Sequence, residues 1–198
     1  MECVLVVEDL VSESVMRRVL ADCQPSWRVS QVVNCGGVAR MKEGVERYKN
    51  ASNVMPHVVM ADLDSHACAP KLMSDWGIAS ELPRLIFRVA VREVESWVLG
   101  DREGVAEWLQ VARAKVPQDP ERLADPKSAL LALGRKSLSR RLRSELCPAP
   151  GSSASQGPLY NQRLCGFIAQ EWNLARARLV APSLDKACVR IAGCVPSD

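Results

Sequence analysis

The first half of the chain alternates between short apolar runs and segments whose apolar residues recur at helical spacing. The run at 57–61 (HVVMA) is apolar without alternation, which is typical of a strand buried on both faces of a parallel sheet. Strands that alternate with helices in this way indicate the α/β class, with a mainly parallel four-stranded sheet between helices. The predicted strands are 2–7, 27–33, 57–61 and 85–91.

Helices are expected between and after these strands. Ser12 precedes apolar residues at helical spacing, Val15 and Val19 among them, and we expect Ser12 to be the N-cap of this helix. A second helix is predicted over 38–48, between the second and third strands. After the fourth strand the apolar spacing is again helical.

The second half of the chain shows a helical pattern only. Prolines separate what are expected to be short helices. Two apolar stripes, one beginning at Tyr160 and one at Leu184, are predicted to belong to the core. The Pro-, Gly- and Ser-rich segment 147–158 is predicted to be a flexible loop. We therefore expect an α/β core over 1–112 and a helical extension over 113–198.

Length and composition narrow the class of protein. The chain has 198 residues, of which 47% are hydrophobic and 25% charged, and this apolar share is sufficient for a folded core. No stretch of about 18 uncharged apolar residues occurs, and the first residues lack the basic start of a signal peptide, so we expect a cytoplasmic protein without membrane contact. The eight cysteines include no C-x-x-C pair, which disfavours zinc or a disulfide framework.

The small net charge of +3 conceals an uneven distribution. Residues 1–80 carry 8 basic and 10 acidic side chains, whereas residues 81–198 carry 18 and 13. In the second half, the segment 134–143 contains five basic residues and no acidic one. Such a segment suits a polyanion, and a solvated helix face is the alternative interpretation. The five basic residues are Arg135, Lys136, Arg140, Arg141 and Arg143.

Three of the predicted strands are followed by carboxylates. In a parallel sheet the carboxyl ends of the strands share one edge, where α/β proteins bind ligands, so we expect these side chains to converge. Asp62 and Asp64 are two residues apart, and on an extended segment both would point the same way. The five candidates are Glu8 after the first strand, Asp62 and Asp64 after the third, and Glu93 and Glu95 after the fourth.

Clustered carboxylates of this kind repel one another and raise each other's pKa unless a cation neutralises them. Oxygen ligands suit Mg²⁺ or Mn²⁺, and the lack of a His or Cys ligand pattern argues against zinc. Other interpretations stay open. Glu8 and Glu93 each precede a predicted helix and would also stabilise its N-terminal dipole. His57 is expected to be a core or edge residue, and His66 is a weaker candidate near the acids.

Three segments carry acidic residues at or after the end of a predicted strand: VLVVE at 4–8, DLD at 62–64 and RVAVREVESWVLGD at 88–101. Two downstream segments accompany them, 120–127 with its DPK triplet and APSLDK at 181–186. Together they resemble an uncharacterised prokaryotic TOPRIM-like family, similar to the TOPRIM nuclease domains of overcoming-lysogenization-defect (OLD) proteins. The resemblance covers most of the chain, and its most specific element is E-x-E-x-W-x-L.

The resemblance implies a four-stranded TOPRIM core that holds a divalent metal on the motif acids and hydrolyses phosphodiesters in nucleic acid. Glu8 and Asp62 would hold a cation that activates the attacking water. A second cation near Asp64 and either Glu93 or Glu95 would stabilise the leaving oxygen.

Other parts of the chain would support that reaction. Lys127, in the DPK triplet, is a candidate for neutralising charge in the transition state. The basic segment 134–143 would hold backbone phosphates without reading the base sequence. Family members often accompany an ATPase of phage-defence operons, and this chain has no G-x-x-x-x-G-K-[ST] loop, so a separate ATPase partner is expected.

Two other functions stay open. The segments 4–9 and 57–64 also resemble the start and the phosphoacceptor strand of a response-regulator receiver, in which Asp62 would accept a phosphoryl group beside Mg²⁺. A receiver is expected to have Ser or Thr at the end of the fourth strand and a fifth strand that ends in Lys before Pro. Here the fourth strand ends at Arg92-Glu93, and the sequence shows no convincing fifth strand. The third candidate is a TOPRIM fold that serves as an interaction or sensor subunit without turnover.

Overall fold

The computed structural model describes residues 1–78 and 82–194. The chain divides into a sheet unit, Met1–Val91 with Ser183–Asp198, and a helical unit, Arg92–Pro182. The boundary predicted near residue 112 was drawn where the strand pattern of the sequence ends. The two units are instead defined by how compactly their residues pack, so the boundary near residue 112 stays a prediction.

The sheet unit is built on parallel strands, which confirms the predicted α/β class. Among the described residues the sheet has four strands in the order β2-β1-β3-β4. All neighbouring pairs are parallel, and Val6 of β1 lies between Val33 of β2 and Val59 of β3. The strands are β1 (Glu2–Val7), β2 (Arg28–Asn34), β3 (His57–Asp62) and β4 (Leu85–Ala90).

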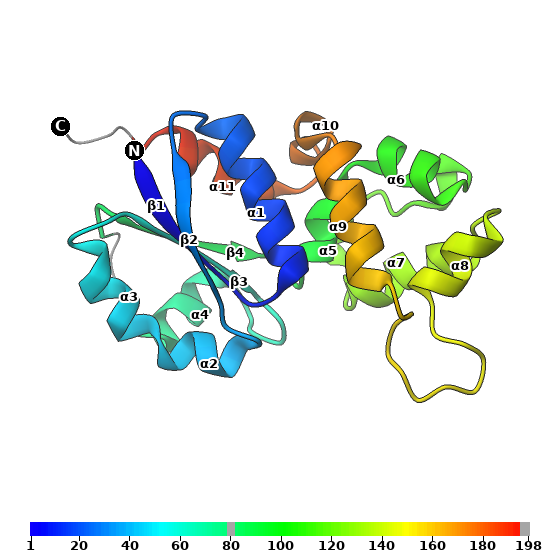
Figure 1. Ribbon diagram of the computed structural model, residues 1–198, viewed down its shortest axis with the longest axis horizontal. Coiled ribbons are helices and arrows are strands. Elements are labelled where there is room, and N and C mark those ends of the chain that lie inside the picture. The colour runs from blue at the N-terminus through cyan, green and yellow to red at the C-terminus, as the bar shows by residue number, and fades with distance from the viewer. Residues whose placement is uncertain (79–81, 195–198) are drawn as a thin grey trace. The chain divides into compact units, whose positions relative to one another are not determined.

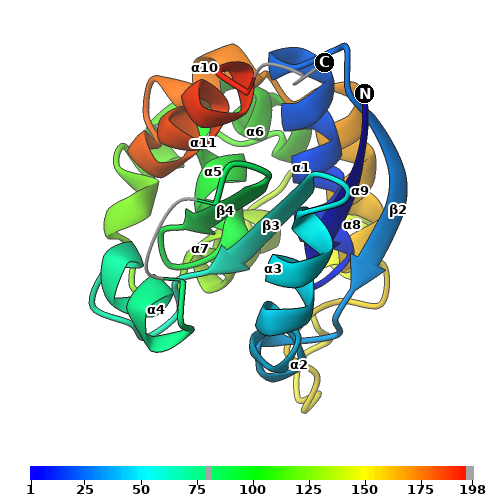
Figure 2. The same ribbon diagram turned by 90° about the vertical axis from the view of Figure 1, so that its left-hand side faces the viewer.

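Helices cover both faces of this sheet (Figures 1 and 2). α1 and α11 lie on one face, and α2, α3 and α4 lie on the other. Right-handed crossovers explain the division, because the chain steps from β1 to β2 in one direction across the sheet and from β2 to β3 and β4 in the opposite direction. These helices are α1 (Leu10–Cys23), α2 (Val38–Glu43), α3 (Val45–Ser52), α4 (Ala69–Asp75) and α11 (Pro182–Ala192).

An apolar core lies between the sheet and the helices α2 to α4. Phe87 of β4 packs edge-on against Trp76, with the two ring centroids 5.6 Å apart. Met41 and Leu72 are fully buried in the same cluster. Because β1 and β3 are the central strands, they are buried on both faces, which explains why their sequences are apolar without alternation.

The N-cap of α1 is Asp9, and the prediction of Ser12 for this role is wrong. The Asp9 carboxylate accepts a hydrogen bond from the backbone N–H of Ser12 at 2.8 Å. Both residue types cap helices well, and because the helix begins at Leu10, the N-cap position falls on Asp9, three residues before Ser12. Asp9 is therefore engaged in capping the helix that follows the candidate residue Glu8.

The helix predicted over 38–48 is in fact two helices, α2 and α3, which meet at Gly44. A Cβ on Gly44 would lie 2.4 Å from the hydroxyl oxygen of Tyr48, so the Tyr48 ring occupies the space that a side chain would need. The same hydroxyl lies 3.4 Å from Cys35 Sγ in the core. The apolar spacing continues across the glycine, and spacing alone therefore predicted one helix.

The helical unit is organised around buried aromatic residues. Trp97 and Trp172 are fully buried, and the Trp172 indole N–H donates a hydrogen bond to the Val98 carbonyl at 3.2 Å. Trp108 stacks on Phe167 with the ring centroids 4.6 Å apart. The helices of this unit are α5 (Val94–Gly100), α6 (Arg102–Leu109), α7 (Pro126–Arg135), α8 (Arg140–Leu146), α9 (Tyr160–Gln170) and α10 (Leu174–Arg178), with short 3-10 turns at Arg113–Lys115 and Pro120–Arg122.

A buried ion pair joins α6 to α10 within the helical unit. The fully buried Asp101 carboxylate accepts hydrogen bonds from the backbone N–H groups of Gly104 and Asn173, at 3.1 and 2.8 Å. Its remaining partner is the Arg176 guanidinium, at 2.6 Å. Asp101 is thus the N-cap of α6 and the ion-pair partner of α10, so its charge is well compensated despite its burial.

Two further properties of the described residues bear on the class of protein. All eight cysteines lie in the described part of the chain as free thiols, and five of them are buried, so they act as small apolar side chains. No helix within 1–78 and 82–194 combines the length and the apolar character that crossing a membrane requires.

Candidate functional site

Glu8 lies at the carboxyl edge of the sheet, directly after β1. Its Oε1 accepts a hydrogen bond from the backbone N–H of Asp62, the last residue of β3, at 3.0 Å. Because β1 and β3 are neighbours in the sheet, the topology brings these two strand ends together although they are 54 residues apart in the chain.

The surroundings of Glu8 disfavour its charged form. Burial raises the pKa of the Glu8 carboxyl to about 7, against the opposing effect of the Asp62 hydrogen bond. The nearby carboxylates of Asp64 and Asp9 raise this pKa further. Near neutral pH, Glu8 is therefore partly protonated, and a cation beside it would favour the carboxylate.

Asp64 lies in a turn after β3 and not on the strand itself. β3 ends at Asp62, and Asp64 has a φ of 48°, in the left-handed region where Asp is enriched among non-glycine residues. The argument that alternate residues point the same way needs an extended segment, so it does not apply to Asp64. The proximity of Asp64 to Glu8 arises from this turn.

Both histidines contact backbone carbonyls of the sheet unit. His57 is buried at the start of β3, with Nδ1 at 2.7 Å from the Met55 oxygen. His66 lies beyond Asp64, with Nδ1 at 3.1 Å from the Leu63 oxygen. His57 is therefore placed as a core residue, and the His66 ring is held against the turn that carries Asp64.

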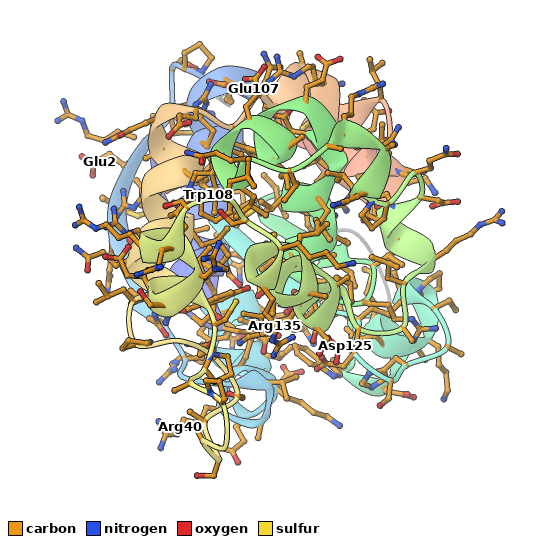
Figure 3. The ribbon with its side chains drawn as sticks, turned by 90° about the vertical axis from the view of Figure 1, so that its right-hand side faces the viewer. Glu2, Arg40, Glu107, Trp108, Asp125 and Arg135 are labelled. Atoms are coloured by element: carbon orange, nitrogen blue, oxygen red, sulfur yellow. The ribbon has the colours of Figure 1, made fainter. Side chains whose placement is uncertain are left out.

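Glu93 belongs to the helical unit, where it stands before α5 and contacts the first turn of α7. It is the N-cap residue of α5, and its Oε2 accepts a hydrogen bond from the backbone N–H of Lys127 at 2.9 Å. Lys127 lies in the first turn of α7, whose N-cap Asp125 and last residue Arg135 are marked in Figure 3. Glu93 thus places a negative charge at the N-terminus of α7, where the helix dipole favours it.

Glu95 is buried in the helical unit, with 5% of its surface exposed. Its Oε1 accepts a hydrogen bond from the Tyr160 hydroxyl at 2.9 Å. Burial raises the pKa of Glu95 to about 7, and the Glu93 carboxylate adds to the shift. The hydrogen bond from Tyr160 and the charge of Lys127 act in the opposite direction and favour the carboxylate.

Lys127 completes this group of residues, which we call the Glu95 cluster: Glu93, Glu95, Lys127 and Tyr160. The Lys127 ammonium lies 5.1 Å from the centroid of the Tyr160 ring, within the range of a cation–π contact. Sequence reasoning placed Tyr160 in an apolar stripe and missed its contact with Glu95. The signal was present, because the hydroxyl of a tyrosine in a buried stripe needs a hydrogen-bond partner.

The acids fall into two sets that belong to different units, Glu8 with Asp62 and Asp64 in the sheet unit and Glu93 with Glu95 in the helical unit. Among the described residues, no group of three or more His, Cys, Asp or Glu side chains is arranged to hold a metal ion. Mg²⁺ commonly uses one or two protein carboxylates, while water and substrate phosphates complete its shell. Glu8, Asp62 and Asp64 carry oxygen donors of the type that such an open site uses.

The five basic residues of segment 134–143 have different surroundings. Arg141 is exposed and pairs with Glu145 at 2.9 Å, and Glu145 also pairs with Arg163 at 2.6 Å. The Arg143 guanidinium donates a hydrogen bond to the Ser137 carbonyl. For Arg141 the solvated helix face is thus an adequate description. Arg135 ends α7, Lys136 is its C-cap, and Arg140, Arg141 and Arg143 lie on α8.

Comparison with known proteins finds similarity in structure and none in sequence. No family model matches the chain, and no curated protein matches its sequence. Among solved structures, the C-terminal region of the Burkholderia pseudomallei OLD protein is similar, with 15% sequence identity and a TM-score of 0.46. The matched region covers 96% of this chain and 98% of that chain. A similarity at this level carries no argument about function.

Proposed function

We propose that this protein is the divalent-metal-dependent nuclease subunit of a prokaryotic anti-phage defence system, and that it hydrolyses phosphodiester bonds together with a separate ATPase. The observation that carries the proposal is the contact between Glu8 and the end of β3, in which a half-buried carboxyl with a pKa of about 7 meets Asp62. Glu8 contributes its carboxyl and Asp62 its backbone N–H, and the two residues belong to the TOPRIM-like motifs at 4–8 and 62–64.

Mg²⁺ or Mn²⁺ is the cofactor that we propose for Glu8, Asp62 and Asp64. Such a cation would lower the pKa of a bound water and polarise the scissile phosphate. Glu8 would release its proton to become a ligand, because a nearby positive charge favours the carboxylate. Asp62 is held in place by the sheet, whereas Asp64 projects from a turn.

In the helical unit, we propose that Glu95 holds or moves a proton during the reaction. A carboxyl with a pKa of about 7 is suited to this, because general acid–base catalysis works best with a pKa near the operating pH. Tyr160 acts as a positioning residue through its hydrogen bond to Glu95. Glu93 is the proposed metal ligand of this unit, and Lys127 is the proposed positive group for the transition state.

The basic segment is proposed to bind the nucleic-acid backbone. Lysine and arginine contacts to phosphates supply affinity without sequence specificity, which suits a defence nuclease. The proposed ATPase partner supplies ATP hydrolysis, because the chain has no phosphate-binding loop of the Walker type.

A receiver module is a second candidate, because Asp62 ends β3 where a phosphoacceptor would stand. Two observations disfavour the receiver. The described residues form four strands in one sheet, without the fifth strand of a receiver. β4 ends at Ala90 and is followed by Val91 and Arg92, in place of the expected Ser or Thr. A third candidate is an interaction or sensor subunit that binds its partner and cleaves nothing.

The proposed function is tested by two measurements on the purified chain. The first is binding of Mn²⁺, followed by electron paramagnetic resonance. The second is nicking of supercoiled plasmid DNA in Mg²⁺ or Mn²⁺, with EDTA as the control. We expect both binding and nicking. A chain that binds Mn²⁺ but cleaves neither DNA nor RNA would support the interaction or sensor subunit, and a chain that does neither would contradict the proposed metal site.

A further inference from the structure

A cavity of about 860 Å³ lies within the helical unit, at the end of α7 and along α8. Arg135, Arg140 and Arg143 line one part of it. The rest is lined by Cys147 and by the segment that joins α8 to α9, including Pro148 and Pro158. Its volume falls in the range of small-molecule binding sites.

The segment between α8 and α9 is held at both ends by hydrogen bonds. The backbone N–H of Gly157 donates a hydrogen bond to the Leu146 carbonyl at 2.8 Å, and that of Leu159 donates to the Glu145 carbonyl at 3.0 Å. A Cβ on Gly157 would lie 2.4 Å from the Glu145 carbonyl oxygen, so the loop closes directly on the end of α8. At the other end, the buried Cys147 thiol donates to the Leu131 carbonyl at 3.4 Å. These contacts make the loop a wall of the cavity.

The cavity carries positive charge that the protein does not neutralise. Glu145 is the acidic residue nearest along α8, and its two ion pairs are with Arg141 and Arg163, outside the cavity. In the described part of the chain, no carboxylate forms an ion pair with any of the three arginines that line the cavity. An anion that binds to several of these arginines at once would gain charge-assisted hydrogen bonds.

Much of the remaining lining is apolar. Pro148, Ala149, Pro150 and Pro158 form this part together with Cys147. Proline rings offer flat apolar surface, and arginine guanidinium groups bind phosphate through two parallel hydrogen bonds. An anion with a flat apolar part would therefore contact both the arginines and the apolar lining residues, whereas inorganic phosphate would contact only the arginines.

We propose that this cavity binds a nucleoside phosphate, with the phosphate on Arg135, Arg140 and Arg143 and the base against the proline wall. The ligand is either a free nucleotide or the 5′-phosphorylated end of a nucleic-acid strand, since both present the same chemistry. The proposal does not rest on the proposed nuclease activity, because the binding requires no metal and no acidic residue of the candidate site.

Calorimetric titration in EDTA tests the proposal on the full chain, and EDTA removes any contribution from a metal site. The probes are AMP, pyrophosphate, and a five-nucleotide DNA strand with either a 5′-phosphate or a 5′-hydroxyl. We expect AMP to bind more tightly than pyrophosphate. Tighter binding of the 5′-phosphorylated strand than of AMP identifies the strand end as the ligand, and the reverse order identifies a free nucleotide. The proposal would be overturned if neither AMP nor the 5′-phosphorylated strand bound saturably. It would also be overturned if pyrophosphate and AMP bound with equal affinity.

Variants of basic residues inside and outside the cavity locate the site. Arg135→Gln and Arg140→Gln should each weaken binding by about tenfold, the loss expected for one charged hydrogen-bond donor. Lys115→Gln removes the same charge from an exposed position of the helical unit that does not line the cavity, so it should change affinity by less than about twofold. Equal losses in Lys115→Gln and Arg140→Gln would show diffuse attraction to a basic surface and would overturn the assigned site.

The loop wall is tested separately by Gly157→Ala. The added methyl group would meet backbone atoms of Glu145 and Cys147, so the loop must move. We expect weaker AMP binding and unchanged pyrophosphate binding, with the fold monitored by circular dichroism. Gly166→Ala in α9 is the control, since nothing lies within 4 Å of its added Cβ. Unchanged AMP affinity in a folded Gly157→Ala variant would show that the proline wall takes no part.

Discussion

The buried carboxylate of Glu95 accepts a hydrogen bond from the hydroxyl of Tyr160, 65 residues further along the chain. This contact links the start of α5 to the start of α9 and gives the buried Glu95 carboxylate a hydrogen-bond partner. A phenol that donates to a carboxylate favours its charged form, whereas burial favours the protonated form, and burial is the larger effect because the pKa of Glu95 stands at about 7.

The pH dependence of stability should therefore contain a contribution from Glu95. Its pKa is higher in the folded protein than the ordinary value of 4.5, so folding binds a proton and is favoured at low pH. As pH rises from about 4.5 to about 7 that stabilisation is lost, with a slope that approaches about 1.4 kcal/mol per pH unit for one proton. Urea denaturation of the wild type and of Glu95→Gln across this range measures the difference.

Two further variants control this measurement. Tyr160→Phe removes the donor that favours the carboxylate, so the pKa of Glu95 should rise further and the loss of stability should extend to higher pH. Glu46→Gln, whose side chain is 72% exposed, should leave the pH dependence unchanged. The interpretation is wrong if the wild type and Glu95→Gln lose stability in parallel between pH 4.5 and 7.

Removal of either strand-end acid should abolish metal-dependent nicking. Glu8→Ala and Asp62→Ala each delete a proposed ligand at the carboxyl edge of the sheet. Asp62→Ala keeps the backbone N–H that binds Glu8, so the local fold should survive. Asp22→Ala, on the surface of α1 in an ion pair with Arg18, is the control and should nick plasmid DNA normally. Nicking by both Glu8→Ala and Asp62→Ala would contradict the metal-site assignment.

Phosphorylation at Asp62 separates the receiver from the nuclease. A receiver accepts a phosphoryl group from small phosphodonors on the aspartate that ends its third strand. We expect no addition at Asp62 when the protein is incubated with acetyl phosphate and Mg²⁺ and then examined by mass spectrometry. A single phosphoryl group at Asp62, absent from the Asp62→Ala variant, would establish the receiver function instead.

Gly44 and Gly166 should respond in opposite directions to the same substitution. Gly44→Ala forces a methyl group against the Tyr48 ring and should cost about 1–3 kcal/mol through overpacking. Gly166→Ala lies in a helix with open space around it and should stabilise the protein by up to about 1 kcal/mol. Urea denaturation gives both values. Equal stability of Gly44→Ala and the wild type would show that the Tyr48 ring moves aside at little cost.

The strands were predictable from the sequence because two of them are buried on both faces. Residues 57–61 lack polar alternation, and β3 (His57–Asp62) lies at the centre of the sheet. Local features were harder to predict. The helix break at Gly44 was not predicted, because the apolar spacing continues across the glycine. The sequence did not distinguish Asp9 from Ser12 as the N-cap, because both residue types cap helices well.

The sequence predicted which acidic residues belong to the candidate site, but it did not predict their contacts or their burial. The carboxylates at the strand ends could be read from the sequence, and the sheet order places Glu8 against Asp62. Contacts between distant segments could not be predicted, because no local pattern marks them. Tyr160 looked like one more member of an apolar stripe, and no local pattern marked the hydrogen bond between the Glu93 carboxylate and the first turn of α7. Burial, which sets the pKa of Glu95, is likewise a property of the folded unit.

The salt dependence of DNA binding tests the wider role of the basic segment. Each phosphate contact releases counterions, so the logarithm of the binding constant falls with the logarithm of salt concentration by about 0.9 per contact on duplex DNA. Joint neutralisation of Arg140, Arg141 and Arg143 to Gln should flatten that slope, as measured by fluorescence anisotropy. A control variant with the same loss of charge in the sheet unit, at Arg17, Lys49 and Lys71, should weaken binding less and keep the slope. An unchanged slope in the first variant would leave these arginines as a solvated helix face, whereas equal flattening in both would show that DNA responds to net charge and not to α8.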